Sequence, residues 1–243
     1  MRKFVGVFVL VVALVFAAGM PRVDAAVEYT LNWSGFAVPA NEGQQITAVT
    51  GSWIVPLIRN APPGFSSSWI GIGGYGTRDL IQTGTASSGR LEGDYAWYET
   101  LPDNETRITG CAGDASCTVK QGDRVSASVT NIGGSTWVIA MTDSGRWWWS
   151  KTLSYQSSLS SAEWVFEAPT VGFSGLPVGF QTLPAYAPHA RFLSGGTYRL
   201  NGVNRPLTTG VATRLKMFTA TPSFVAPDGH FTVCAYKPTC ANF

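Results

Sequence analysis

The stretch SSAEWVFEAP, residues 160–169, is rich in aromatic and β-branched residues and ends at a proline, which predicts a β-strand. Side chains alternate along a strand, so Trp164 and Phe166 share one face and require a hydrophobic core. Glu163 and Glu167 share the opposite face. Two carboxylates on one strand are candidates for general acid–base chemistry, and a half-exposed strand with two solvated acids is the alternative.

The rest of the sequence alternates short strand-like segments with turn residues. Its 27 glycines and 14 prolines supply frequent turns, and no segment keeps the helical period for more than about two turns. Strands are predicted at residues 45–55, 67–72, 80–83, 94–100, 124–131, 136–142, 147–155, 162–167, 196–200 and 214–219. Many short antiparallel strands in one chain predict an all-β sandwich or barrel.

The N-terminal segment, residues 1–26, has the pattern of a signal peptide. Arg2 and Lys3 precede an apolar run that ends near Ala18, and small residues allow cleavage after Ala25 or Ala26. The alternative is an uncleaved anchor, although the apolar run is shorter than the ~20 residues that a membrane span needs. We therefore expect an exported protein in which residues 27–243 form a single β-domain.

The charge of the chain excludes a nucleic-acid partner. Without residues 1–26 the chain keeps 14 of its 17 basic and 14 of its 15 acidic residues, so its net charge is near zero. Only 13% of the residues are charged, which leaves few groups whose protonation would unfold the protein in acid. The composition thus permits work at low pH. We expect a monomer that does not bind a membrane after export.

The four cysteines form two pairs of equal spacing: Cys111 with Cys117, and Cys234 with Cys240. An even number in an exported chain indicates disulfides, and three connectivities are possible. Equal short spacing favours the two local loops. Zinc is the alternative, but the cysteine spacing is wrong for it and both histidines are distant in sequence.

The segment Asp143-Ser144-Gly145 carries the signature of pepsin-like aspartic peptidases. Those enzymes need two facing aspartates, and this chain has one copy of the motif. Strand-like segments flank it, so a hairpin turn is the better interpretation. The sequence contains no Gly-x-Ser-x-Gly motif, phosphate-binding glycine loop or metal-ligand cluster, so no cofactor or metal is expected.

Five further motifs occur in a characteristic order: NWSG at 32–35, GSWIVP at 51–56, SWIGI at 68–72, LIQTG at 80–84 and YAWYE at 95–99. Together with AEW at 162–164 they resemble the glutamic peptidases, or eqolisins, of peptidase family G1. The resemblance extends from about residue 32 to about residue 169. It implies a concanavalin-like, or jelly-roll-like, sandwich of two curved antiparallel sheets with a substrate groove on the concave side.

The resemblance also implies a catalytic site. Glu163 matches the catalytic glutamate and Gln82 the catalytic glutamine. In that scheme Glu163 activates a water as general base and then protonates the leaving amine, while Gln82 stabilises the oxyanion. Trp69, Trp97 and Glu99 match residues of the substrate groove. The implied substrate is a polypeptide, and the implied activity is that of an endopeptidase most active in acid.

One position departs from the family. The chain reads Gly71-Ile-Gly-Gly74, where the family commonly has an aspartate at position 73. Asp79 and Asp94 are near in sequence, and the sequence does not show whether either replaces the missing carboxylate. A sandwich of this family without activity is therefore one alternative.

Two alternatives belong to other classes of protein. A glycosidase would use Glu99 and Glu163 as its two carboxylates, and their separation would predict retention or inversion. A sugar-binding module without catalysis would use the run Trp147-Trp-Trp149 instead. Neighbouring residues on a strand point to opposite faces, so at least one of these tryptophans is expected to be exposed.

Overall fold

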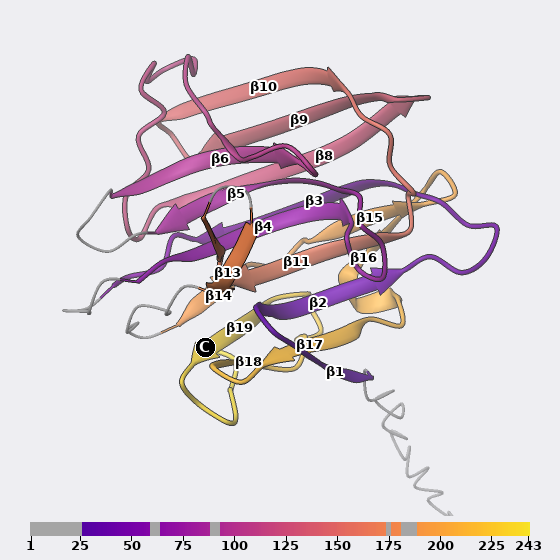
Figure 1. Ribbon diagram of the computed structural model, residues 1–243, viewed down its shortest axis with the longest axis vertical. Coiled ribbons are helices and arrows are strands. Elements are labelled where there is room, and N and C mark those ends of the chain that lie inside the picture. The colour runs from indigo at the N-terminus through magenta and orange to yellow at the C-terminus, as the bar shows by residue number, and fades with distance from the viewer. Residues whose placement is uncertain (1–25, 59–63, 88–92, 174–175, 181–188) are drawn as a thin grey trace, which may run out of the picture.

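The computed structural model describes residues 26–58, 64–87, 93–173, 176–180 and 189–243 (Figure 1). The predicted signal peptide lies outside the described residues, apart from its last residue. Almost all regular structure is β, with one short 3-10 helix at Leu207–Thr209. Within the described part of the chain, no helix has the length and apolarity needed to span a bilayer.

The first layer of the sandwich contains the strand predicted at residues 162–167. Neighbouring strands pair in the order β1-β17-β2-β11-β4-β5-β6-β7. Their bounds are β1 (Val27–Thr30), β17 (Thr213–Met217), β2 (Trp33–Pro39), β11 (Ser161–Glu167), β4 (Ser66–Gly73), β5 (Leu80–Ser87), β6 (Asp94–Thr100) and β7 (Thr106–Arg107). The β1–β17 pair is parallel, and the other pairs in this layer are antiparallel.

The second layer is built on the long strand β3. Pairing follows the order β16-β15-β3-β8-β9-β10, and Figure 1 shows β8, β9 and β10 stacked at one end of the molecule. The bounds are β16 (Val203–Pro206), β15 (Thr197–Leu200), β3 (Ile46–Ile54), β8 (Arg124–Gly133), β9 (Thr136–Asp143) and β10 (Trp147–Ser154).

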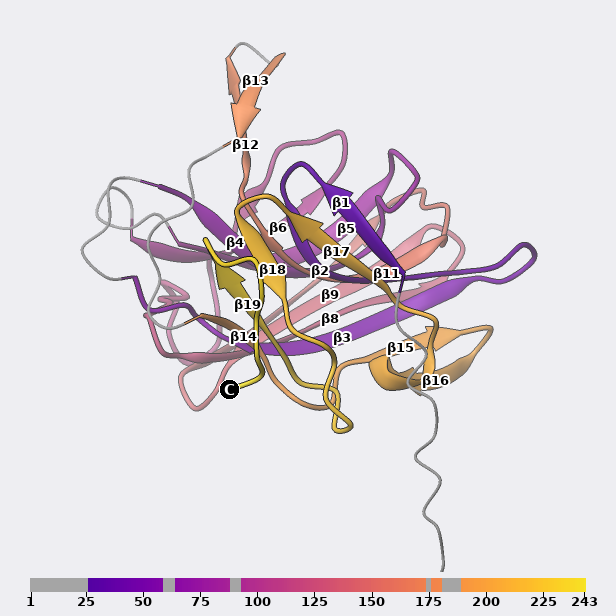
Figure 2. The ribbon, with the colours of Figure 1, turned by 90° about the horizontal axis from the view of Figure 1, so that it is seen from below.

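Three short strands near the C-terminus join the two layers into one 17-stranded sheet. Pairing runs from β17 through β18 and β19 to β14, which pairs with β3. These strands are β14 (Ala190–Phe192), β18 (Ala220–Pro222) and β19 (Phe231–Ala235). A separate hairpin, β12 (Thr170–Phe173) with β13 (Leu176–Phe180), projects from the body of the molecule in Figure 2.

The core lies between the layers and is organised by Trp164. Its indole Nε1 donates to the Thr50 carbonyl of β3 at 2.9 Å, which links β11 to the opposite layer. Gly51 permits this approach, because a Cβ there would lie 2.7 Å from Ile70 Cγ2 and 3.0 Å from Trp164 Cδ1. The predicted alternation is confirmed, because Trp164 and Phe166 are buried in this core while Val165 belongs to a second apolar cluster on the other face.

The predicted all-β sandwich is confirmed, and each predicted strand has a counterpart. The predicted ranges do not include β1, β2, β7, β12, β13, β14, β16, β18 or β19. Most of these are short, but β2 has seven residues and lies between β17 and β11 in the first layer. The tryptophan run behaves as expected: Trp148 is 60% exposed, whereas Trp147 is buried.

Both predicted disulfides are present. Cys111 is bonded to Cys117, and Cys234 to Cys240. Neither pair leaves a free thiol among the described cysteines.

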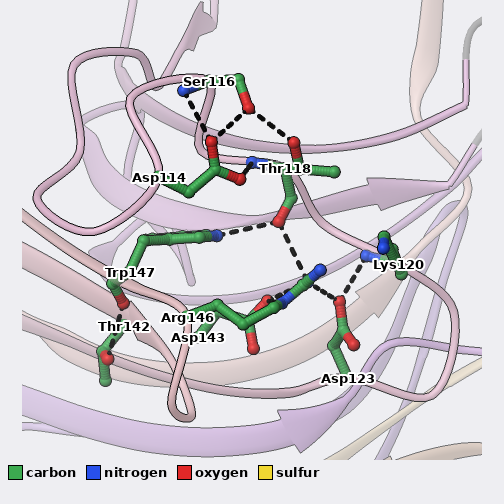
Figure 3. Close-up of polar contacts among 9 residues, drawn as sticks. All are labelled: Asp114, Ser116, Thr118, Lys120, Asp123, Thr142, Asp143, Arg146 and Trp147. Atoms are coloured by element: carbon green, nitrogen blue, oxygen red, sulfur yellow. Dashed lines mark hydrogen bonds and ion pairs between the residues drawn. The ribbon is translucent and has the colours of Figure 1, made fainter.

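The Asp143-Ser-Gly145 segment is the turn between β9 and β10, as predicted, but its aspartate is more than a turn residue. Asp143 is 2% exposed and its carboxylate accepts from the Arg146 guanidinium (Figure 3). Arg146 also pairs with Asp123 and donates to the Thr118 carbonyl at 3.0 Å. This network fastens the hairpin turn to the segment that follows the first disulfide loop, which is a structural role.

Candidate active site

The predicted catalytic residues lie in one row across the first layer. Glu163 of β11 pairs with Gly71 of β4, Gly71 with Gln82 of β5, and Gln82 with Glu99 of β6. Residues opposite one another on adjacent strands point to the same face of the sheet. The row therefore brings two carboxyl groups and one amide to the face turned away from the core, with a glycine between Glu163 and Gln82.

A cleft of about 570 Å³ opens on this face. Gln82, Trp97 and Glu99 line it, together with Glu167. Glu163 does not line the cleft and is 0% exposed. The structure thus brings four of these side chains to one cleft and encloses the fifth, Glu163, beside it.

Leu80 contributes to this enclosure. Its side chain lines the cleft, and its Cδ1 lies 2.9 Å from where a Cβ on Gly71 would be. Gln82 Cβ lies 3.1 Å from the same point. The missing side chain at Gly71 is therefore replaced by Leu80 and Gln82, which close over the middle of the row.

Gln82 is held by Glu99. Its Nε2 donates to Glu99 Oε2 at 2.5 Å, whereas its buried Oε1 has no hydrogen-bond partner within the described residues. Burial is the main cause that raises the pKa of Glu99 to about 7, and the hydrogen bond from Gln82 partly opposes it. Glu99 is therefore neutral at acid pH, when it still orients the amide of Gln82.

Glu163 is the most deeply buried acid of the row. Burial raises its pKa well above the ordinary value; the Ser161 hydroxyl opposes this, the charge of Asp79 adds to it, and the Tyr75 backbone N–H opposes it weakly. Neither carboxyl oxygen makes a hydrogen bond of normal geometry with a described residue. Buried acceptors without partners are costly, so a donor held between Glu163 and Gln82 would stabilise both side chains.

Glu167 is the acid that the sequence did not assign to the site. Its Oε1 accepts from Asn32 Nδ2 at 2.8 Å, and its Oε2 accepts from Trp69 Nε1 at 2.6 Å. Burial raises its pKa to about 7 against the hydrogen bond from Trp69. Strand alternation already placed Glu167 on the face of Glu163, and this is the signal that could have added it to the site.

Comparison with known proteins accounts for the fold. The Peptidase A4 family matches residues 31–204. The chain belongs to this family, whose members are the eqolisins. It is a glutamic endopeptidase.

Solved structures of eqolisins share its fold. A scytalido-glutamic peptidase with a peptide-based transition-state analogue has a TM-score of 0.69 and 19% identity, over 84% of this chain and 98% of that chain. SCP-B, in a complex with the tripeptide Ala-Ile-His, has a TM-score of 0.67 and 18% identity over the same shares. The aspergilloglutamic peptidase from Aspergillus niger has a TM-score of 0.54 and 17% identity, over 70% of this chain and 98% of that chain. No curated protein sequence matches the chain.

The two predicted groove tryptophans of this eqolisin have different positions. Trp97 lines the cleft, and its Nε1 donates to Ser67 Oγ at 3.0 Å. Trp69 is fully buried beneath Trp33, which meets it edge to face with ring centroids 4.9 Å apart. Trp69 therefore reaches the cleft through its hydrogen bond to Glu167.

Family membership also decides between the classes of protein that the sequence left open. The glycosidase and the sugar-binding module are set aside, because neither belongs to the Peptidase A4 family. In the described part of the chain, no three His, Cys, Asp or Glu side chains gather into a metal site.

Proposed function

We propose that this eqolisin is an exported, acid-active peptidase whose catalytic pair is Glu163 and Gln82. The observation that carries the proposal is their place in one row, with a glycine between them and three acceptor oxygens that make no hydrogen bond of normal geometry with a described residue. A water held there would donate to Glu163 and to Gln82 Oε1 and would face a substrate carbonyl entering from the cleft. The signal-like N-terminal segment and the two disulfides support export.

The reaction follows from the donors and acceptors of the pair. Ionised Glu163 takes a proton from the water, whose oxygen attacks the scissile carbonyl carbon. Gln82 Nε2 has two hydrogens; one remains on Glu99, and the other is available for the developing oxyanion. Glu163 then transfers its proton to the leaving nitrogen as the C–N bond breaks, which restores the carboxylate.

Access to Glu163 requires a movement of Leu80. Glu163 is 0% exposed, and the Leu80 side chain covers the middle of the row. A peptide seated in the cleft would have to displace this side chain to bring its carbonyl between the two catalytic groups. The same displacement would let water reach the buried carboxyl.

The charges in the row support activity in acid. The active form has an ionised Glu163 with neutral Glu99 and Glu167 on the same face, because further negative charges there would oppose its ionisation. Glu99 and Glu167 have pKa values of about 7, so both are neutral below that pH. We expect kcat/KM to fall as the pH rises towards neutrality. An optimum at or above pH 7 would contradict the proposal.

Three variants test the catalytic pair. Glu163→Gln keeps the shape and removes the base, so kcat/KM on a peptide substrate should collapse while circular dichroism shows an intact fold. Gln82→Ala removes the oxyanion donor and should cost about 10²–10³ in rate. Glu167→Gln is the matched comparison, on the same strand and face four residues further on. It should cost less than Glu163→Gln, and the reverse order would move the role of base to Glu167.

A further inference from the structure

The turn between β4 and β5 carries a carboxylate with an unusual number of donors. Asp79 Oδ2 accepts from Ser157 Oγ at 3.0 Å, from the Ser158 backbone N–H at 2.6 Å and from Ser158 Oγ at 2.9 Å. We propose that Asp79 is a positioning residue of the peptidase: it locks this turn against the entry of β11 and sets a fixed negative charge beside Glu163. The inference rests on the proposed role of Glu163.

The place of Asp79 is next to the glycine at which the sequence departs from its family. Gly73 has a φ of +85°, which favours glycine. A Cβ built on it would lie 2.8 Å from Asp79 Oδ2 and 2.6 Å from the Asp79 carbonyl oxygen. The Asp79 carboxylate thus lies where a side chain at position 73 would begin, and the chain keeps an acid there from a different residue.

The hydrogen bonds of Asp79 connect the turn to the catalytic strand. Ser157 and Ser158 lie just before β11. With its hydrogen on Asp79, Ser158 Oγ can accept from Ser160 Oγ, which lies 2.9 Å away. Within the turn, the Gly74 backbone N–H donates to Thr77 Oγ1 at 2.9 Å. Asp79 therefore fastens the closed end of the β4–β5 hairpin to the segment that leads to Glu163.

The same donors keep Asp79 charged. Burial opposes its charge, but the Ser158 backbone N–H and the hydroxyls of Thr77, Ser158 and Ser157 together outweigh burial and lower its pKa. Asp79 therefore stays ionised to lower pH than an ordinary aspartate does.

The groups facing Glu163 or sharing its row come from every neighbouring element: Ala37 of β2, Gly71 of β4, Gln82 of β5, Glu99 of β6, Glu167 of β11, and Tyr75 and Asp79 of the turn. Glu99 and Glu167 are neutral below about pH 7. Burial raises the pKa of Tyr75, which is therefore neutral too. Among these groups, Asp79 alone is ionised in acid. Its negative charge favours the protonated form of Glu163, so Glu163 becomes the ionised base only at higher pH.

The test is the pH dependence of kcat/KM in Asp79→Asn. Removing the charge should move the rising, acidic limb of the profile to lower pH, because Glu163 then ionises more easily. Asp114→Asn is the matched control. Asp114 accepts from the Ser116 backbone N–H at 3.0 Å and the Ser116 hydroxyl at 2.5 Å, but it lies in the first disulfide loop. A purely structural role of Asp79 would lower the rate without moving the limb, and an unmoved limb in folded Asp79→Asn overturns the inference.

A second variant decides the matter if Asp79→Asn does not fold. The double variant Ser157→Ala, Ser158→Ala keeps the carboxylate and removes both hydroxyl donors. Asp79 then ionises at higher pH, and the acidic limb should again move down; an unmoved limb overturns the inference. Glu163→Gln, measured alongside, separates the two proposals. If Glu163→Gln is inactive and the acidic limb does not move in the Asp79 variants, only the proposed role of Asp79 is wrong. If Glu163→Gln is active, the proposed catalytic role of Glu163 is wrong as well.

Discussion

Stability should fall as the pH rises, because the cleft buries carboxyl groups in their neutral form. The pKa of Glu99 lies at about 7 in the folded protein against an ordinary value of 4.5. A group whose pKa is raised by folding stabilises the fold fully below its unfolded pKa and loses this contribution as the pH passes through its folded pKa. The difference corresponds to about 3 kcal/mol in the free energy of unfolding between pH 4 and pH 8.

Burial also raises the pKa of Glu167 to about 7, so this group should contribute a similar amount. Together, Glu99 and Glu167 make the free energy of unfolding depend on pH. Glu99→Gln should remove roughly half of their joint contribution. The assay is urea unfolding at pH 4 and pH 8, followed by circular dichroism. Glu42→Gln, a change at an exposed glutamate between β2 and β3, should keep the wild-type difference between the two pH values. If Glu99→Gln also keeps the wild-type difference in unfolding free energy, folding does not raise the pKa of Glu99.

Trp69→Phe removes the indole N–H that lowers the pKa of Glu167. NMR titration of Glu167 should then give a higher pKa, and unfolding should cost about 1–3 kcal/mol less; an unchanged pKa would contradict this. Arg146→Ala leaves the buried Asp143 carboxylate without its partner and should lower the unfolding free energy by about 1–3 kcal/mol, with kcat/KM per folded molecule unchanged. Loss of turnover in folded Arg146→Ala would show that the network has more than a structural role. Among the described residues, three glutamates and no lysine, arginine or histidine line the cleft. Two of them, Glu99 and Glu167, ionise only near pH 7, so peptides with lysine near the scissile bond should gain in kcat/KM over matched peptides with glutamate as the pH approaches 7. Equal rates would count against the cleft as the peptide-binding site.

Local patterns in the sequence were sufficient for the features that depend on near neighbours. Alternation along β11 separated Glu163 from Trp164, because successive side chains of a strand point to opposite faces wherever the strand lies. Equal short spacing predicted the disulfides Cys111–Cys117 and Cys234–Cys240, because six residues span only a small loop. The turn at Asp143 followed from the two strand-like segments that flank it.

The strands that the sequence did not predict are those that local alternation does not reveal. β1 pairs with β17 in parallel, and β18 and β19 join the two layers, although these segments have little alternation of their own. They are strands because distant residues supply their hydrogen bonds. The sequence also indicated nothing of the Arg146 network that buries Asp143, since its other partner, Asp123, lies on a different segment.

For the candidate site, the sequence by itself determined which side chains share the concave face, because this depends only on strand period and on motifs within single strands. Tertiary structure alone decided that Glu163 is fully buried while Glu167 lines the cleft. It also decided that Asp79 lies at Gly73, close to the start of β11. The physical reason is that the register between strands and the path of the β4–β5 turn arise from contacts between residues far apart in the sequence, such as Asp79 with Ser157 and Ser158, 78 and 79 positions away. Burial and charge at each carboxyl group depend on these contacts, and no local pattern encodes them.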